Sequence, residues 1–197
     1  MQVLLTAENK TFKEKIKLLV RNFISKDQVL NLKELWQHLH KNSFISKDNS
    51  FLRNVLLVEA MSKAEPGLGL FLLTQFTCIE IINSYANEKL KNKYLGKLIS
   101  GEYIGSFALT EPNAGSDISM IETNAKKENT NWILNGHKIW SSNGSISDII
   151  ITFAQTKPHK DKSGITCFLV PSHTKEIKIL KKETQSTIDL SKGVVIL

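Results

Sequence analysis

The stretch Phe107-Ala-Leu-Thr-Glu-Pro-Asn-Ala-Gly-Ser-Asp117 stands close to the point where this sequence changes its pattern. On its N-terminal side, apolar residues recur at the spacing of amphipathic helices. From Tyr103 onward, short runs of β-branched and aromatic residues are separated by turn residues, as in strands. We therefore predict an α+β fold with two domains: an all-helical domain at residues 1–103 and a β-barrel-like domain at residues 104–197.

Apolar stripes at helical spacing mark several segments of the first half. They are Phe12, Ile16, Leu19 and Phe23; Val29, Leu32, Trp36 and Leu39; Leu52, Val55 and Leu56; and Leu90, Tyr94, Leu95 and Leu98. Another segment, Leu68–Ile82, is apolar on nearly every face, which predicts a helix buried on several sides. We expect helices to end before Pro66-Gly67 and at Ser100-Gly101, because proline and glycine are helix stop signals.

The second half carries strand signals. Tyr103–Leu109, Ile149–Ala154 and Ile165–Val170 are rich in strand-forming residues. Within Asn131–Trp140, the pair Asn135-Gly136 is flanked by strand formers, and such a pair is typical of a type I′ turn. The sequence therefore predicts a hairpin that turns at Asn135-Gly136, and Asn129-Thr130-Asn131 marks an earlier turn.

The composition is that of an ordinary globular protein, with 197 residues, 41% hydrophobic and 23% charged. Two cysteines can form at most one disulfide, which is too few to hold together a fold of this size. No cluster of Cys and His in the sequence suggests a metal site. The longest uncharged apolar stretch, Gly67–Ile79, is too short to span a bilayer. The first residues show no basic region before a hydrophobic run. We expect a cytoplasmic protein with no membrane span.

The net charge is +7, from 26 Lys and Arg against 19 Asp and Glu. Lysines such as Lys13, Lys15 and Lys17 alternate with acidic or apolar residues, whereas a nucleic-acid footprint is normally a clustered patch. We therefore expect a solvated lysine-rich surface and no nucleic-acid partner. Excess positive charge still favours an anionic partner, including a phosphorylated cofactor.

The loop Asn113-Ala-Gly-Ser116 has small side chains and follows a strand that Pro112 ends. Such a loop can direct several backbone N–H groups at one anion, and the Ser116 hydroxyl can add another donor. Thr110 and the backbone of Leu109 could hydrogen-bond a flat heterocycle at the strand end. The alternative is a simple turn, capped by Ser116 and Asp117.

A second segment, Trp132-Ile-Leu-Asn-Gly-His-Lys-Ile-Trp140-Ser-Ser-Asn-Gly144, ends in a polar turn. Trp140 at the end of its strand can lay its ring against a planar ligand, while Ser142 donates to the ligand's edge. The alternative is a core tryptophan followed by a turn.

Taken together, in this order and spacing, the two segments resemble the acyl-CoA dehydrogenase family of flavoproteins. The matching pieces are Phe107-Ala-Leu-Thr-Glu-Pro-x-Ala-Gly-Ser-Asp117 and Trp132-x-Leu-Asn-Gly-x-Lys-x-Trp140-x-x-Asn-Gly144. Gly164–Pro171 resembles the family's next strand, and Asn87–Glu102 resembles the helix that leads into its flavin loop. The resemblance covers roughly Leu52 to the C-terminus and makes the β-barrel-like half the counterpart of the family's middle domain.

The resemblance implies that FAD is the cofactor. In the family, the strand and loop matching Phe107–Ser116 line the flavin. Leu109 and Thr110 would hold the isoalloxazine ring, and Gly115 and Ser116 would approach the pyrophosphate. Ser116 would also reach the thioester-bearing arm of the substrate. The implied cofactor-binding residues are Phe107, Ala108, Leu109, Thr110, Gly115, Ser116, Trp140, Ser141 and Ser142.

Glu111 is a carboxylate beside this loop and could be taken for a general base, but the matching family position is structural. Family members are longer than this chain, and the resemblance implies a fragment that stops before a C-terminal helical bundle. In the family, that bundle carries the catalytic glutamate, much of the homo-oligomer interface and part of the FAD site. We therefore assign no catalytic residue and no metal ligand to this chain.

The activity that the resemblance implies is FAD-dependent α,β-dehydrogenation of an acyl-CoA or acyl carrier protein thioester, in fatty acid metabolism. Electrons would leave through a separate electron-transfer acceptor. We expect the fragment to be inactive without a C-terminal domain or a complementary C-terminal subunit. One alternative is a non-catalytic truncated remnant, or a protein-interaction module with the same fold. Another keeps the fold and changes the chemistry to that of an oxidase or a flavin-dependent hydroxylase.

Overall fold

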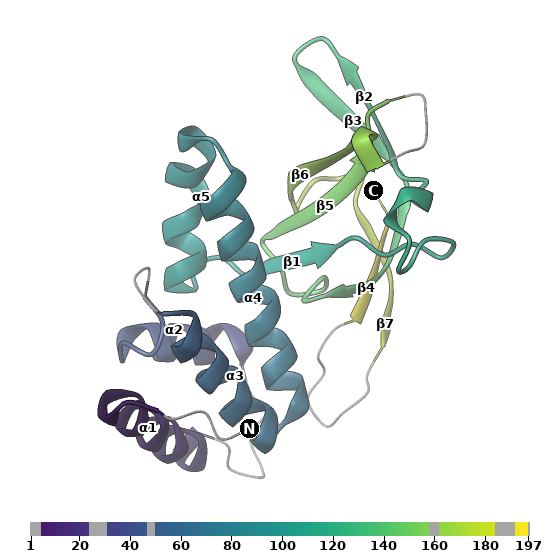
Figure 1. Ribbon diagram of the computed structural model, residues 1–197. Helices are drawn as coiled ribbons and strands as arrows, with labels where there is room; N and C mark the ends of the chain where they lie inside the picture. The colour runs from purple at the N-terminus through teal and green to yellow at the C-terminus, as the bar shows by residue number, and fades with distance from the viewer. Residues whose placement is uncertain (1–4, 24–30, 47–49, 158–161, 184–191, 197) are drawn as a thin grey trace. The chain divides into compact units, whose positions relative to one another are not determined.

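A computed structural model describes residues 5–23, 31–46, 50–157, 162–183 and 192–196. The chain divides into two compact units, Met1–Glu102 and Tyr103–Leu197. The described part of the first unit is helical, and that of the second is built on a mixed β-sheet (Figure 1). The predicted fold class, a helical part followed by a β part, is confirmed.

The helical unit contains five described helices, α1 (Ala7–Phe23), α2 (Leu32–Lys41), α3 (Phe51–Ala64), α4 (Pro66–Tyr85) and α5 (Glu88–Ser100). Polar residues just before them satisfy the first backbone N–H groups: the side chains of Asn31, Ser50 and Asn87 accept hydrogen bonds at the starts of α2, α3 and α5. Pro66 begins α4, where a missing N–H costs nothing. Gly101 closes α5 at a φ of 79°. Val29, in the second predicted stripe, lies outside the described residues.

Helix α4 is the central apolar helix of its unit and packs against α3 and α5 (Figure 1). By length and composition alone it could cross a membrane, with a mean hydropathy of 1.3, and half of that window is buried inside the protein. Its buried Phe71 lies edge-on to the ring of Trp36 on α2, at a centroid distance of 6.1 Å. The Trp36 indole N–H donates to the carbonyl of Ile99 at 3.0 Å, so the core ties α2 to the end of α5.

The β unit contains β1 (Gly105–Ala108), β2 (Asn124–Glu128), β3 (Asn131–Asn135), β4 (His137–Ser142), β5 (Ile149–Gln155), β6 (Ile165–Pro171), β7 (Lys178–Glu183) and β8 (Lys192–Ile196). The sheet runs β3-β2-β5-β1-β4-β8-β7, and β6 pairs with β5. Strand β5 lies between β1, which is parallel to it, and β6, which is antiparallel (Figure 1). Its residues Ile149–Ile151 are fully buried.

The predicted hairpin at Asn135-Gly136 is wrong. Strand β3 pairs with β2, through the turn at Asn129, whereas β4 pairs with β1 and β8. Asn129 has a φ of 54°, while Gly136 has no positive φ and therefore cannot form a type I′ turn. Gly136 is required for a different reason: a Cβ there would lie 2.1 Å from Thr123 Oγ1. The glycine permits a close approach between two segments.

Candidate functional site

The loop after β1 is closed on itself. The backbone N–H of Glu111 donates to the carbonyl of Ala114 at 2.9 Å, and the N–H of Ala114 donates to the carbonyl of Glu111 at 3.2 Å. Ala114 is buried, while Gly115 and Ser116 behind it are exposed. A Cβ built on Gly115 meets nothing within 4 Å. The loop therefore presents backbone with open space in front of it.

The alternative interpretation, a turn capped by Ser116 and Asp117, holds for Asp117 but not for Ser116. Asp117 Oδ1 accepts hydrogen bonds from the N–H of Ser119 at 3.1 Å and from its hydroxyl at 2.6 Å, which starts the short helix η1 (Ile118–Met120). Ser116 makes no hydrogen bond within the described part of the chain. Asp117 is thus the capping residue, and the Ser116 donors remain free for an external acceptor.

Trp140 sits in a backbone irregularity of β4. Its φ is 57°, a left-handed conformation that costs a non-glycine residue about 1–2 kcal/mol. The register of β4 against β8 shifts between Lys138 and Ser141, so these two buried residues lie on either side of a bulge. Trp140 itself is 50% exposed, so it is not the core tryptophan of the alternative interpretation. Strain of this kind is concentrated at functional sites.

A buried ion pair lies under the loop. Lys138 Nζ is 2.6 Å from Glu111 Oε1, with side-chain exposures of 0% and 2%. Burial raises the pKa of Glu111, but hydrogen bonds from Lys138, Thr123 and the Glu122 backbone outweigh it and hold that pKa below its ordinary value. Burial lowers the pKa of Lys138. A carboxylate already bound to an ammonium group is a poor proton acceptor, so this geometry does not favour Glu111 as a general base.

The strand end that follows Trp140 is tied to β1. Ser142 pairs with Phe107, and the Ser142 carbonyl accepts the hydroxyl of Ser106 at 2.8 Å. The Asn143 amide donates to the carbonyl of Gly105 at 3.2 Å. Within the described residues, the buried hydroxyl of Ser141 has no hydrogen-bond partner. This turn therefore has a fixed position against β1.

The structure brings most of the predicted site residues together. Strands β1 and β4 are antiparallel neighbours, and beyond the end of β1 the N–H of Ile139 donates to the carbonyl of Thr110 at 2.8 Å. The neighbouring group contains Phe107, Ala108, Leu109, Thr110, Trp140, Ser141 and Ser142. Gly115 and Ser116 follow the closed loop, and no hydrogen bond among the described residues ties them to this group. Their roles toward a cofactor stay predictions.

The donor set of this region suits FAD. Peptide N–H groups and hydroxyls match the carbonyls of a flavin ring and the oxygens of a pyrophosphate, and the open space in front of Gly115 admits a close approach. An exposed tryptophan ring offers a flat apolar face. Sequence reasoning missed Lys138 as the partner of Glu111. Lys138 is a named position of the second matching segment, which was the one available signal, but a lysine in a strand is usually solvated.

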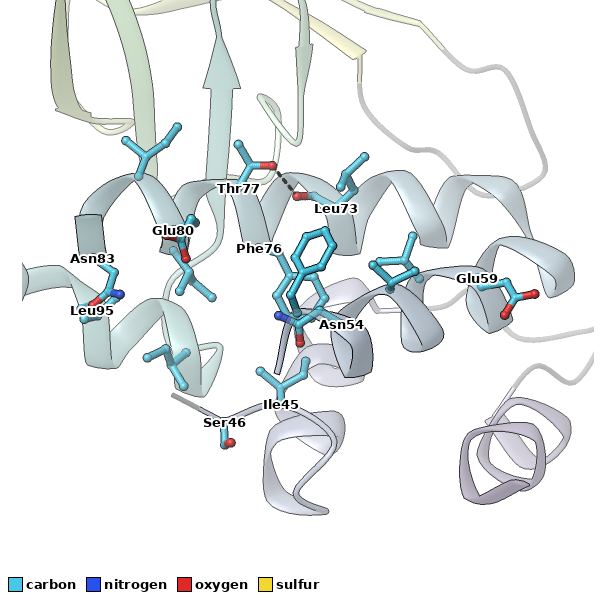
Figure 2. Close-up of a pocket in the computed structure, with 16 residues that line it drawn as sticks. Ile45, Ser46, Asn54, Glu59, Leu73, Phe76, Thr77, Glu80, Asn83 and Leu95 are labelled. Carbon is cyan, nitrogen blue, oxygen red and sulfur yellow. Dashed lines mark hydrogen bonds between the residues drawn. The ribbon is translucent and has the colours of Figure 1, made fainter. Parts of the chain in front are cut away.

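A separate pocket of about 580 Å³ lies in the helical unit, between α3, α4, α5 and the segment at Ile45 (Figure 2). Its size is within the usual range of small-molecule pockets. Apolar side chains such as Val55, Leu73 and Phe76 form most of its wall, with Asn54 and Glu80 among its polar members. Leu73 is 54% exposed, so the pocket is open to solvent.

Comparisons with known proteins agree with this architecture. The N-terminal domain of acyl-CoA dehydrogenases matches residues 13–102, and their middle domain matches residues 106–192. Mitochondrial isovaleryl-CoA dehydrogenase of Pongo abelii is 38% identical over 152 residues, which are 71% of this chain and 36% of that protein. The chain thus spans about a third of the length of this curated relative.

Two solved structures share the fold. Glutaryl-CoA dehydrogenase from Mycobacterium smegmatis superimposes with a TM-score of 0.87 at 24% identity, over 98% of this chain and 53% of that one. The FAD complex of PigA superimposes with a TM-score of 0.86 at 25% identity, over 100% of this chain and 57% of that one. With both domain patterns matched over most of its length, the chain belongs to the acyl-CoA dehydrogenase family.

Proposed function

We propose that this chain supplies the flavin-contacting part of an FAD-dependent acyl-thioester dehydrogenase. The observation that carries the proposal is the strained, half-exposed Trp140 beside the end of β1, where Thr110 and the small-residue loop offer hydrogen-bond donors. Family membership supports it, because the relatives are acyl-CoA dehydrogenases and one solved neighbour is an FAD complex.

Each predicted residue has a proposed part in holding FAD. Phe107, Ala108, Leu109 and Thr110 would line the isoalloxazine ring from β1, and Trp140, Ser141 and Ser142 would flank it from β4. Gly115 and Ser116 would approach the pyrophosphate, with Ser116 also reaching the thioester arm of the substrate. When bound, the flavin supplies a hydride acceptor. The side chains of this region bind, orient and exclude water.

The substrate we propose is an acyl-CoA or an acyl carrier protein thioester, dehydrogenated between its α and β carbons in fatty acid metabolism. An electron-transfer acceptor would take up the electrons. The open pocket between α3, α4 and α5 offers apolar wall to an acyl chain. We propose the cytoplasm as the location, since the exposed thiol of Cys167 suits a reducing compartment.

The base that removes the α-proton is proposed to come from outside the described residues. Glu111 is engaged with Lys138, and a carboxylate bound to an ammonium group is a poor proton acceptor. A C-terminal domain or a complementary subunit would supply the base. This chain alone is then expected to bind FAD weakly and to show no dehydrogenase activity.

Native mass spectrometry of the protein isolated from its own host tests the proposal. A complex of this chain with FAD and a polypeptide that supplies a base supports it, as does reduction of the bound flavin by an acyl thioester. A chain without FAD, even when FAD is added in excess, contradicts it. Oxygen consumption on adding substrate would identify an oxidase or hydroxylase in place of a dehydrogenase.

Site-directed variants add a second test. Trp140→Ala should weaken FAD binding, because it removes the flat apolar face beside Thr110. Trp132→Ala is the matched control, since Trp132 is also an exposed tryptophan of the β unit, 42% exposed, but packs against Phe168 on β6. Equal FAD affinity in the two variants would contradict the placement of the ring at Trp140.

The second candidate function is a non-catalytic remnant or protein-interaction module with the same fold. In that case the open apolar pocket of the helical unit would receive an apolar side chain of a protein partner instead of an acyl chain. Under this hypothesis, the chain isolated from its host carries no flavin and no polypeptide that supplies a base, and it binds no FAD even when FAD is added in excess.

A further inference from the structure

The buried pair of Lys138 and Glu111 has no part in the binding roles described above. Removing two charges from water is costly, and a buried ion pair is therefore weak evidence for a stabilising role. The groups that the pair contacts are more informative. Lys138 Nζ donates to the carbonyl of Leu109 at 3.1 Å as well as to Glu111 at 2.6 Å. The ammonium group thus reaches the backbone of the strand end directly.

Glu111 fixes the ammonium group from the other side. Its carboxylate accepts the backbone N–H of Glu122 at 2.5 Å and that of Thr123 at 3.1 Å, where the chain enters β2. Its backbone forms both hydrogen bonds that close the loop with Ala114. The pair therefore joins the end of β1, the closed loop, the entry to β2 and strand β4 in one network.

Because a peptide bond is planar, this network also fixes the direction of one backbone N–H bond. A trans peptide is planar, and its C=O and N–H point in opposite directions. The chain contains no cis peptide among its described residues. Because the Leu109 carbonyl points at Lys138, the Thr110 N–H in the same peptide points away from the buried pair. The next peptide, Thr110–Glu111, is held in the same way. Its carbonyl, that of Thr110, accepts the Ile139 N–H at 2.8 Å, and its N–H, that of Glu111, points the opposite way and donates to the Ala114 carbonyl.

The Thr110 N–H is therefore a donor whose direction is set but whose acceptor is not part of the described protein. No hydrogen bond from it is found within the described residues, whereas the N–H groups of Glu111 and Ala114 on the same stretch are both used. Thr110 is only partly buried, so an external acceptor can reach it.

We propose that Lys138, held by Glu111, is a positioning residue that orients the Leu109–Thr110 peptide so that the Thr110 N–H donates to the edge of the flavin ring. The orientation is a property of this chain by itself. Its use toward a flavin rests on the proposed function. A lysine is suited to this part because its ammonium group can donate to a carboxylate and to a carbonyl at once.

The test compares the wild-type chain with Lys138→Met and with the double variant Glu111→Gln/Lys138→Met. The single variant leaves an unpaired buried carboxylate and is expected to lose stability. The double variant removes both charges at similar side-chain volume, so we expect it to fold. It still lacks the cation at the Leu109 carbonyl. Thr152→Val is the matched control, because it deletes a buried hydroxyl that donates to the neighbouring Ala108 carbonyl at 3.0 Å.

The first measurement is the N–H residual dipolar coupling of Thr110 without FAD, which reports the direction of that bond. We expect it to change in the double variant and to stay the same in Thr152→Val, with the couplings of β3 unchanged in both. An unchanged Thr110 coupling in a folded double variant overturns the proposal, whatever the flavin does. A purely structural role for the pair would alter stability without altering this coupling.

The second measurement is FAD titration followed by flavin fluorescence. Losing one oriented hydrogen bond should weaken FAD binding by about tenfold in the folded double variant, and by less in Thr152→Val. Equal FAD affinity of wild type and double variant overturns the use of this N–H toward the flavin. If the wild type binds no FAD, the proposed function fails, while the dipolar coupling still decides whether Lys138 orients the peptide.

Discussion

Trp36 in the helical unit and Trp140 in the β unit differ in how each side chain relates to its backbone. Trp36 is 0% exposed, lies in a helix, and donates its indole N–H to Ile99 at 3.0 Å. Trp140 is 50% exposed and has a φ of 57°. The first combines burial, a hydrogen bond and a favourable backbone. The second combines an unfavourable backbone with a ring half in water.

The difference indicates that Trp36 contributes to stability and that Trp140 contributes to ligand binding. Burying a large aromatic side chain stabilises a domain strongly, so Trp36 is explained by the stability of its own unit. An unfavourable conformation that burial does not offset is typical of residues kept for binding or catalysis. We therefore expect substitutions around Trp36 to act on unfolding and substitutions at Trp140 to act on ligand binding.

The largest effect should come from Trp36→Ala. It leaves a cavity beside Phe71 and Phe76, whose rings lie edge-on to the indole, and it removes the donor to Ile99. We expect the free energy of unfolding to fall by about 3–5 kcal/mol, measured by urea denaturation. Trp140→Ala should change it by less than about 1 kcal/mol. Similar losses in the two variants would contradict the comparison.

Gly101→Ala should show how tightly the surroundings of Trp36 are built. A Cβ at Gly101 would lie 2.6 Å from Trp36 Cδ1, and the φ of 79° is unfavourable for alanine. We expect a loss of about 1–3 kcal/mol, with a change in Trp36 fluorescence. Gly96→Ala on α5 is the control: a Cβ there meets nothing within 4 Å, so helix propensity should raise stability by about 1 kcal/mol. A neutral Gly101→Ala would mean that the contact with Trp36 can relax.

The helical unit was the more predictable of the two because its signals are local. Pro66, Ser100 and Gly101 lie within a few residues of the apolar stripes that they bound, and in the structure α3 ends at Ala64 and α5 at Ser100, as these residues indicate. A cap or a stripe depends on neighbours three or four positions away, so one sequence is enough to find it.

The β unit was less predictable because its pairings are long-range. Asn135-Gly136 has the composition of a hairpin turn, but the contact that requires Gly136 is with Thr123, in another segment. The left-handed conformation of Trp140 and the partner of Lys138 depend in the same way on pairing with β1 and β8. The two motif segments lie side by side along β1 and β4 in the structure, but the motifs did not predict the buried pair of Glu111 and Lys138.

A smaller effect is expected when the strain at Trp140 is relieved. Trp140→Gly and Trp140→Ala both remove the ring, but only glycine adopts a positive φ without a steric cost. We expect the free energy of unfolding, measured by urea denaturation, to be about 1 kcal/mol higher for the glycine variant than for the alanine variant. Both variants should bind FAD more weakly than wild type. A glycine variant no more stable than the alanine variant would show that the backbone at this position is not strained.

The smallest expected effect is on the stability of the β unit at acidic pH. The pKa of Glu111 is lowered from 4.5, so between its folded pKa and 4.5 the unfolded chain binds more protons than the folded one. Stability of the β unit should therefore fall as the pH drops from about 4.5 through the folded pKa of Glu111. In the described part of the helical unit, Glu59 also has a lowered pKa, but its side chain is 39% exposed and its ion pairs are screened by water.

The indole N–H signals of Trp36 and Trp140 can follow the two units separately as the pH is lowered in moderate urea. We expect the Trp140 signal of the folded form to be lost first. In Glu111→Gln/Lys138→Met the acid dependence at Trp140 should shrink to that at Trp36, because no carboxylate titrates beneath the loop. If both signals are lost together in the wild type and also in the double variant, the pair of Glu111 and Lys138 does not determine the acid response. The two tryptophans would then differ in burial and backbone conformation but not in the acid sensitivity of their units.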